Sequence, residues 1–394
     1  MRKVIAASWE VSAIVILALI GGALAIAKND DRNRSQALTV HEWGTFTTVA
    51  GLDGQALEWL PLSGPNDLPC FVDHFNSSFA KWSPVGAVLN YREARSRLKG
   101  TVRMETPVLY FYSPREESLN VKVNFPQGFV SEWYPTANVA VGGTTIAWNN
   151  LKVLTQGKTR FPTEASPSHY YKARETDANP VQVAGNDEKF LFYRGLGYFN
   201  VPISARVTPS GKFLIGNTKR EPMPAIVLFE NRGGKIGYRV QAQFEGETTI
   251  DPPTLDRDFG SLQKELEKTL ISAGLFPKEA RAMIETWSDS WFEEGTRVFY
   301  ILQSKTVDRI LPLTIEPAPA HIARAFVGRM EVITPAMVEE VENAISAGDT
   351  VSLAKYGRFL GSIVDRMSPR PEHAQVLLDA AYKKVLSELS SACK

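Results

Sequence analysis

The stretch TVHEWGTFTTVAG, residues 39–51, opens the folded part of the chain and predicts a β-strand. β-Branched and aromatic residues dominate it, as is typical of strands, and a Gly ends it. Neighbouring side chains of a strand point to opposite faces. The two predicted faces carry His41, Trp43, Thr45 and Thr47 on one side, and Glu42, Phe46 and Thr48 on the other. His41 and Glu42 therefore cannot bind one metal ion together from a regular strand.

Further strand-like segments follow, separated by Pro, Gly, Asn and Ser. They include TPVLYFY (106–112), SLNVKVNF (118–125), TTIAWNNLKVL (144–154), PAIVLFE (224–230) and KIGYRVQAQF (235–244). Several alternate apolar with polar residues, which indicates one buried and one solvated face. Residues 37–250 are therefore predicted to form an antiparallel β-sandwich-like domain.

The periodicity changes after TIDPPTLDRD, residues 249–258. FGSLQKELEKTLISAG and the segment after Pro277 are amphipathic helices, each followed by Gly. Strands are expected again in TRVFYILQ and RAFVGRMEVI, and Thr334–Pro335 begins a helix that ends at Gly348. Residues 251–394 are predicted to be an α+β region ending in a helical cap, so the fold class of the whole chain is α+β.

The first 27 residues differ from the rest. Arg2 and Lys3 give a basic start, residues 11–27 carry no charge, and Ala25-Ile26-Ala27 resembles a signal-peptide cleavage site. An uncleaved membrane anchor over residues 11–27 is the alternative. Either reading, with residues 28–36 as a linker, predicts an extracytoplasmic protein that is periplasmic or secreted and meets the membrane only through this segment.

Charge and cysteine content restrict the function further. The chain has 44 basic and 43 acidic residues, and without residues 1–27 the counts become 42 and 42. This balance argues against a nucleic-acid partner, which a basic surface would attract. The two cysteines, Cys70 and Cys393, could form a disulfide in an oxidising compartment or remain as two thiols.

The helix after Pro277 carries a column of carboxylates. Glu285, Asp289 and Glu293 are spaced four residues apart, so they share one helix face and repel one another. A divalent metal ion bound by these three oxygen ligands would relieve the repulsion. Pairing with Arg281 and Arg297, or plain solvation, is the alternative explanation.

Candidate catalytic residues are His41, Glu105 and Glu132. His41 could act as a base with partners from elsewhere, or pack within its strand beside Trp43. Glu132 and Trp133 form one of three Glu-Trp dipeptides, and an acid beside an aromatic ring suits saccharide binding or cleavage. Core packing of the Trp is the alternative. GxSxG and Walker A motifs are absent, so neither serine-hydrolase nor nucleotide chemistry is indicated.

VHEWGTFTTVAG, RMETPVLYFYSPRE, EWYP and DSWFEEGTRVFYI together resemble a group of exported bacterial proteins of unassigned activity. The resemblance implies a shared architecture and an envelope location, and it transfers no catalytic residue. The function expected is therefore binding of a ligand or envelope partner, such as a glycan, through the β-rich body. The alternatives are a metal-assisted hydrolase that uses His41 with converging carboxylates, and a structural component of the envelope.

Overall fold

The computed structural model describes residues 37–63, 68–74, 97–155, 159–165, 168–219, 222–371 and 374–380. The strands before residue 250 are β1 (Thr39–Val49), β2 (Asp73–His74), β3 (Val102–Tyr112), β4 (Glu117–Asn124), β5 (Gly128–Tyr134), β6 (Asn138–Val139), β7 (Thr145–Val153), β8 (Val181–Val183), β9 (Asn186–Glu188), β10 (Leu191–Gly197), β11 (Ile203–Val207), β12 (Phe213–Asn217), β13 (Ile226–Arg232), β14 (Lys235–Gln241) and β15 (Glu247–Ile250). Short 3₁₀ helices η2 (Val141–Gly143) and η3 (His169–Arg174) lie among them.

The rest of the chain mixes helices with strands. These elements are α3 (Phe259–Ser272), α4 (Pro277–Trp291), β16 (Gly295–Leu302), α5 (Ser304–Ile310), β17 (Leu313–Glu316), β18 (His321–Glu331), α6 (Pro335–Ala347), α7 (Thr350–Ala354), η4 (Gly357–Phe359) and α8 (Leu360–Val364). The predicted caps are present: the Thr334 hydroxyl accepts from the Met337 amide, and Gly348 ends α6 in a left-handed conformation. Local sequence signals therefore set these helix ends.

The longest sheet of the described residues has nine strands in the order β14-β13-β16-β18-β1-β3-β10-β5-β2. The opening strand β1 lies in its interior, antiparallel to β3 and parallel to β18. Both faces of β1 are therefore covered, which explains why all but its first residue are buried. Trp43 and Phe46 enter different hydrophobic clusters, so the predicted alternation of faces is confirmed.

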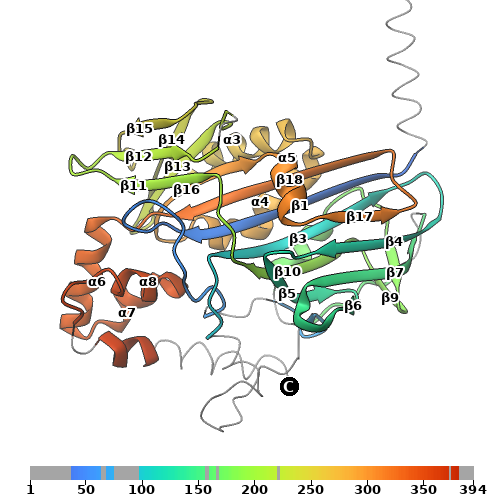
Figure 1. Cartoon of the computed structure of the whole chain (residues 1–394), viewed down its shortest axis with the longest axis horizontal. Helices are drawn as coiled ribbons and strands as arrows, with labels where there is room; N and C mark the ends of the chain where they lie inside the picture. Colours follow the sequence, from blue (N-terminus) through green and yellow to red (C-terminus); the bar gives the residue numbers. More distant parts are fainter. Residues whose placement is uncertain are drawn as a thin grey trace, which may run out of the picture.

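Two smaller sheets form the second β layer. One has the order β17-β4-β7-β8-β9 with β6 beside β7, and the other the order β11-β12-β15. A large apolar cluster joins them to the nine-stranded sheet and includes Phe46, Trp148 and Ile215. This packing of sheet on sheet (Figure 1) confirms the predicted β-rich α+β class.

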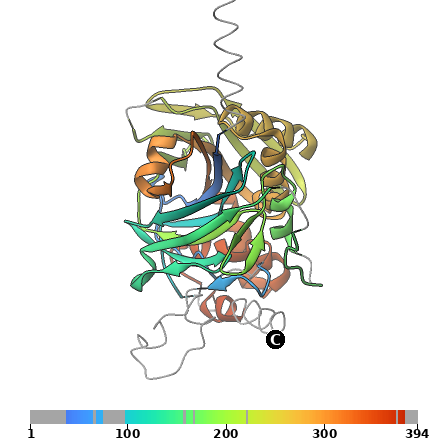
Figure 2. The ribbon, with the colours of Figure 1, turned by 90° about the vertical axis from the view of Figure 1, so that its right-hand side faces the viewer.

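Helices cover the other face of the long sheet. Leu262, Trp287 and Trp291 of α3 and α4 pack with Trp43 and Phe229 of the sheet. In Figure 2 these two helices lie along one side of the layered strands. The C-terminal helices gather at one end of the molecule (Figure 1), where Phe359 stacks on Trp59 with 5.4 Å between ring centroids. We call α6, α7, η4 and α8 the helical cap.

The sheet crosses the expected domain boundary between residues 250 and 251. Strands do give way to helices there, since β15 ends at Ile250 and α3 begins at Phe259. However, β16 and β18 return to the nine-stranded sheet, and β18 is the direct neighbour of β1. The described residues before 250 therefore share their sheet and core with β16 and β18. The reason is physical: β1 needs a partner along each edge, and β18 supplies one of them.

Gly44 interrupts the regular pairing of β1 with β3. Trp43 pairs with Val108 and Thr45 with Glu105, so two steps along β1 match three along β3 and a β-bulge forms. A Cβ on residue 44 would lie 2.8 Å from the Phe326 ring and 3.1 Å from Pro107. The missing side chain lets the bulge pack closely, and the bulge sets which residues of β3 face the helices.

We expect Gly44→Ala to lower the free energy of unfolding by about 1–3 kcal/mol, because the added methyl overpacks a buried site. Urea unfolding followed by circular dichroism measures the change. Gly100→Ala is the matched control, since its nearest neighbour would be an ordinary contact at 3.4 Å. Equal stability of the two variants would contradict the packing role of Gly44.

Several sequence predictions concern residues outside the described ones. Residues 1–27 and the linker 28–36 belong to this group, and so does Cys393. Cys70 is disulfide-bonded. In the described part of the chain, no helix has the length and apolar character needed to span a bilayer.

Candidate functional site

A row of charged side chains crosses the helix-covered face of the nine-stranded sheet. Residues directly opposite one another on neighbouring strands point to the same face. The cross-strand pairs are Thr47 with Arg329, Thr45 with Glu105, Arg194 with Glu132, and Glu132 with His74. Glu105 and Arg194 interact electrostatically and so join the two halves. We call Arg329, Glu105, Arg194, Glu132 and His74, with the two threonines, the polar row.

Most of the polar row is deeply buried. The side chains of Arg329, Glu105, Arg194 and Glu132 are at most 4% exposed, whereas His74 at the sheet edge is exposed. Burying a charge costs several kcal/mol unless opposite charges and hydrogen bonds compensate for the lost water. Five ionisable groups from five strands in one row therefore form a feature that core packing does not require.

Glu105 lies at the centre of a group of arginines. Nη1 of Arg358, from the helical cap, is 2.8 Å from Glu105 Oε1, and Arg103 Nε is 3.7 Å from the same oxygen. Burial raises the pKa of Glu105, but the guanidiniums of four arginines together outweigh burial and hold this pKa below its ordinary value. A buried carboxyl with a lowered pKa reports a positive local potential. The four arginines are Arg358, Arg103, Arg329 and Arg194.

Several buried polar atoms of the polar row, of α4 and of the helical cap have no hydrogen-bond partner among the described residues. They are Thr45 Oγ1, Thr47 Oγ1, Thr286 Oγ1, Trp287 Nε1, Arg329 Nε, Arg358 Nη2 and both carboxylate oxygens of Glu105, whose close contacts are ion pairs. Each such atom costs about 1–3 kcal/mol when nothing satisfies it. They give this region hydrogen-bonding capacity of both donor and acceptor type.

Helix α4 borders the polar row. Its Ser290 Oγ lies 3.1 Å from Arg329 Nη1. Glu293, two residues beyond the end of α4, has its Oε1 2.6 Å from Arg329 Nη2. The guanidinium of Arg194 lies 5.7 Å from the centroid of the Trp287 ring. Residues three or four apart share a helix face, so Thr286 belongs to the same side as Ser290. Helix, sheet and cap thus enclose the positive region.

The three carboxylates expected to bind a metal ion each face a different partner. Lys172 Nζ is 3.5 Å from Glu285, His169 Nδ1 is 2.9 Å from Asp289, and Arg329 is the partner of Glu293. Within the ranges that the structure describes, no three His, Cys, Asp or Glu side chains are grouped so as to hold a metal ion. Each of the three carboxylates thus pairs with a side chain of the protein, namely Lys172, His169 or Arg329.

His41 lies apart from the other two candidate catalytic residues. Its Nδ1 is 2.8 Å from Glu279 Oε2 at the start of α4, and the Tyr112 hydroxyl donates to Glu279 Oε1 at 2.8 Å. His41 is four positions from Thr45, the cross-strand partner of Glu105. This spacing corresponds to about 13 Å along a strand. His41 therefore links β1 to the first turn of α4, while Glu105 and Glu132 share the polar row.

Glu42 faces the opposite layer and has a separate network. Arg324 Nε lies 2.5 Å from Glu42 Oε2, and the Tyr193 hydroxyl donates to Glu42 Oε1 at 2.5 Å. Arg324 also donates to Asp308 of α5 at 2.8 Å. His41 and Glu42 are thus adjacent in β1, yet His41 contacts α4 on one face of the sheet and Glu42 contacts Arg324 and Tyr193 on the other.

Sequence reasoning missed the arginines of the site. Arg194 and Arg329 stand inside the apolar strand segments KFLFYRG and RAFVGRMEVI, and a charged residue in such a run is unusual. A charged residue inside an apolar strand segment was therefore the sequence signal that could have identified these two arginines. Arg358, by contrast, reaches Glu105 from the helical cap across more than 250 positions of sequence, and no local pattern indicates the contact.

Comparisons with known proteins leave the chain without a family. No family model matches the sequence, and no curated protein matches it either. Among solved structures, the mu-homology domain of Danio rerio Fcho1 with bound Eps15 peptide has a TM-score of 0.27 at 7% identity, covering 75% of this chain and 97% of that one. The yeast delta-COP-I mu-homology domain has a TM-score of 0.29 at 7% identity, covering 75% and 96%. Its complex with the Dsl1 WxWxV peptide gives 0.29 at 6% identity with the same coverage. Scores this low do not establish a shared fold, so the ligands of these proteins carry no weight here.

Proposed function

We propose that this chain is an exported, envelope-facing binding protein whose polar row holds an acidic, hydroxyl-bearing ligand such as an acidic saccharide. The apolar N-terminal segment and the resemblance to exported bacterial proteins support the location. The polar row, set in the β-rich body, supports a ligand site within that body.

One observation carries the ligand class: fully buried Glu105 lies 2.8 Å from Arg358 and 3.7 Å from Arg103. These guanidiniums, with those of Arg329 and Arg194, also hold its pKa below the ordinary value. Four guanidiniums of the described residues, those of Arg103, Arg194, Arg329 and Arg358, face three carboxylates there, those of Glu105, Glu132 and Glu293. This excess of one positive charge favours a carboxylate or another anion. Thr45 and Thr47 hydroxyls and the Trp287 indole N–H could hydrogen-bond the hydroxyls of the same ligand. Exposed His74 marks the end of the row from which a ligand would approach.

We expect the purified chain to bind a uronic-acid oligosaccharide more tightly than the same oligosaccharide with its carboxyls reduced. A charge-assisted hydrogen bond contributes about 1.5–3 kcal/mol, which corresponds to about 10–100-fold in affinity. Isothermal titration calorimetry with the two oligosaccharides measures the difference. Equal affinity for both would exclude the acidic-ligand proposal.

Arg194→Lys tests the row itself. It keeps the charge but loses the planar guanidinium, so we expect about tenfold weaker binding of the uronic-acid ligand with the fold retained. Arg115→Lys is the control, because Arg115 pairs with Glu117 on the exposed surface. Unchanged binding by a folded Arg194→Lys variant would place the ligand elsewhere.

A further inference from the structure

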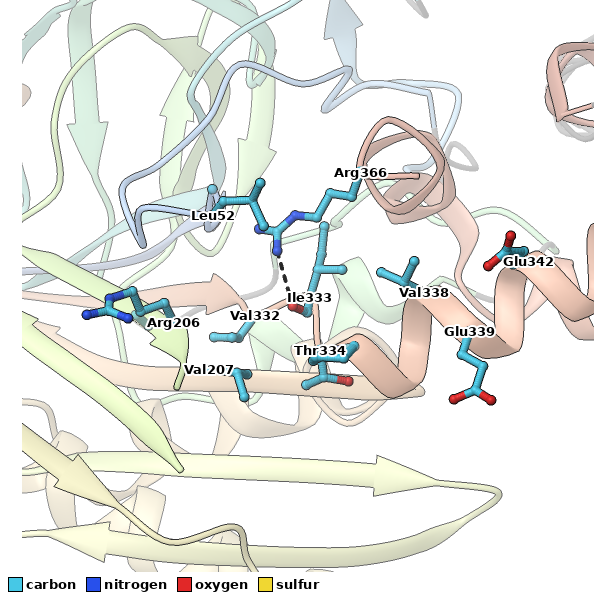
Figure 3. A pocket seen from close by; sticks show the side chains of 13 residues that line it. Leu52, Arg206, Val207, Val332, Ile333, Thr334, Val338, Glu339, Glu342 and Arg366 are labelled. Carbon is cyan, nitrogen blue, oxygen red and sulfur yellow. Dashed lines mark hydrogen bonds between the residues drawn. The ribbon is translucent and has the colours of Figure 1, made fainter. Parts of the chain in front are cut away.

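A second surface feature lies away from the polar row, between β11 and the start of α6. It is a groove with a volume of about 330 Å³. The loop after β1 forms one wall, β11 another and the first turns of α6 the third (Figure 3). We define the β11–α6 groove by Leu52, Val207, Ile333, Val338, Glu339 and Glu342.

The groove has an apolar strip and a fixed floor. Leu52 is 79% exposed at its rim, and Val207 and Val338 are partly buried along it. Arg366 of the C-terminal region donates to the carbonyls of Ile333 and Ala50 and so holds the floor in place, as Figure 3 shows for Ile333. An exposed leucine beside a groove suits an aliphatic side chain of a partner.

Strand β11 presents a free backbone edge to the groove. It is an edge strand, paired only with β12 in the described sheet. The Ala205 amide points away from β12 and donates to Gly54 O at 2.9 Å, so the loop after β1 covers the first part of this edge. Backbone groups two residues apart in a strand point the same way, so the amide and carbonyl of Val207 also face outward, beyond the loop. An extended segment could add to the edge at Val207.

The charges of the groove favour a basic segment. Glu339 and Glu342 lie three residues apart on the exposed face of α6, and no ion pair to a described residue occupies either carboxylate. Glu340 differs, since Lys355 lies 3.9 Å from it. Among the described residues, two cations line the groove, Arg206 on β11 and Arg366 in the floor. The guanidinium of Arg366 is bonded to two floor carbonyls and interacts with Asp53, so Arg206 alone opposes the two glutamates of the open wall.

We propose that the β11–α6 groove is a docking site for an extended peptide segment of a partner protein that carries lysine or arginine beside an aliphatic residue. The aliphatic side chain rests on Leu52, Val207 and Val338. The basic side chain faces Glu339 and Glu342. The peptide backbone pairs with the edge of β11.

Fluorescence anisotropy with labelled peptides tests the proposal on the full chain. The probe is an acetylated and amidated hexapeptide of alternating Lys and Val, and the comparison peptide alternates Glu and Val. We expect the Lys-Val peptide to bind at least about tenfold more tightly, and its affinity to fall with rising salt because the charges are exposed. Equal binding of the two peptides, or no binding of the Lys-Val peptide, would overturn the proposal.

Variants locate the site. Glu339→Lys with Glu342→Lys, and separately Leu52→Asp, are expected to weaken Lys-Val peptide binding at least about tenfold. Glu245→Lys is the control for charge reversal, because it makes one of the two Glu→Lys changes of the double variant on the exposed β14–β15 connection. Arg194→Lys should leave peptide binding unchanged, which separates this site from the polar row. Loss of peptide binding in Glu245→Lys would contradict the proposal. A dimer of the wild-type chain that Leu52→Asp dissociates in analytical ultracentrifugation would also contradict it, because the occupant of the groove would then be a second copy of this chain.

Discussion

Glu105→Gln is expected to lower the free energy of unfolding by about 3–5 kcal/mol, since it removes the anion from a buried group of cations. The substitution keeps the shape of the side chain but leaves Arg358 and Arg103 facing one another and a neutral amide. The four guanidiniums would then be buried with one counter-charge fewer. Chemical denaturation at neutral pH measures the loss.

The control is Glu175→Gln, which breaks an exposed ion pair with Lys172 and should cost less than about 1 kcal/mol. A loss for Glu105→Gln no larger than this control would show that the arginines do not need the Glu105 charge.

The pH dependence of Glu105 has a definite sign. Its pKa in the folded state is lowered, so the carboxylate contributes stability above the pKa it has in the unfolded chain. This contribution disappears as the pH falls through the folded-state pKa. Wild type should therefore lose stability toward acid faster than Glu105→Gln, and the gap between them should narrow below the unfolded-state pKa.

Glu42→Leu is expected to have an effect of similar size on the opposite layer, about 3–5 kcal/mol. Among the residues that the structure describes, it leaves buried Arg324 with Asp308 as its one remaining carboxylate partner. The Tyr193 hydroxyl loses its acceptor as well. The triple variant Glu42→Leu, Arg324→Leu, Tyr193→Phe removes all the stranded polar groups and should recover most of the loss.

Thermal and urea unfolding of the single and triple variants measure this recovery. If the triple variant is less stable than Glu42→Leu alone, the network contributes net stability beyond the cost of stranded charges, and the explanation given for Glu42 fails.

Local patterns predicted much of the secondary structure. The segment after Pro277 was expected to be an amphipathic helix, and its apolar residues Ala280, Ile284, Trp287 and Trp291 are buried in α4. The start of α3 is likewise set locally, since the Asp258 side chain accepts from the Ser261 amide. Such features depend on residues within a few positions of each other, so one sequence contains them.

Local sequence patterns could not predict the parallel pairing of β1 with β18. The two strands are separated by more than 270 positions, and each reads simply as a buried strand. Because the pairing of distant strands depends on the whole set of competing partners, periodicity identifies a strand but not its neighbour. This pairing is why the expected boundary near residue 250 lies inside a shared sheet.

Some features of the candidate site also follow from local sequence, whereas others depend on the tertiary structure. Sequence by itself determined that His41 and Glu42 face opposite layers and that the chain is a β-rich α+β protein. It also placed Glu285 and Asp289 on one helix, whereas Glu293, the third expected member of that column, lies two residues beyond the end of α4. Only the tertiary structure decided that Glu105 and Glu132 join one row, that His41 pairs with Glu279, and that Arg358 approaches from the helical cap. The physical reason is that side-chain direction follows from neighbouring residues, whereas the electrostatic partner of a buried charge follows from which distant elements the fold brings within a few ångströms.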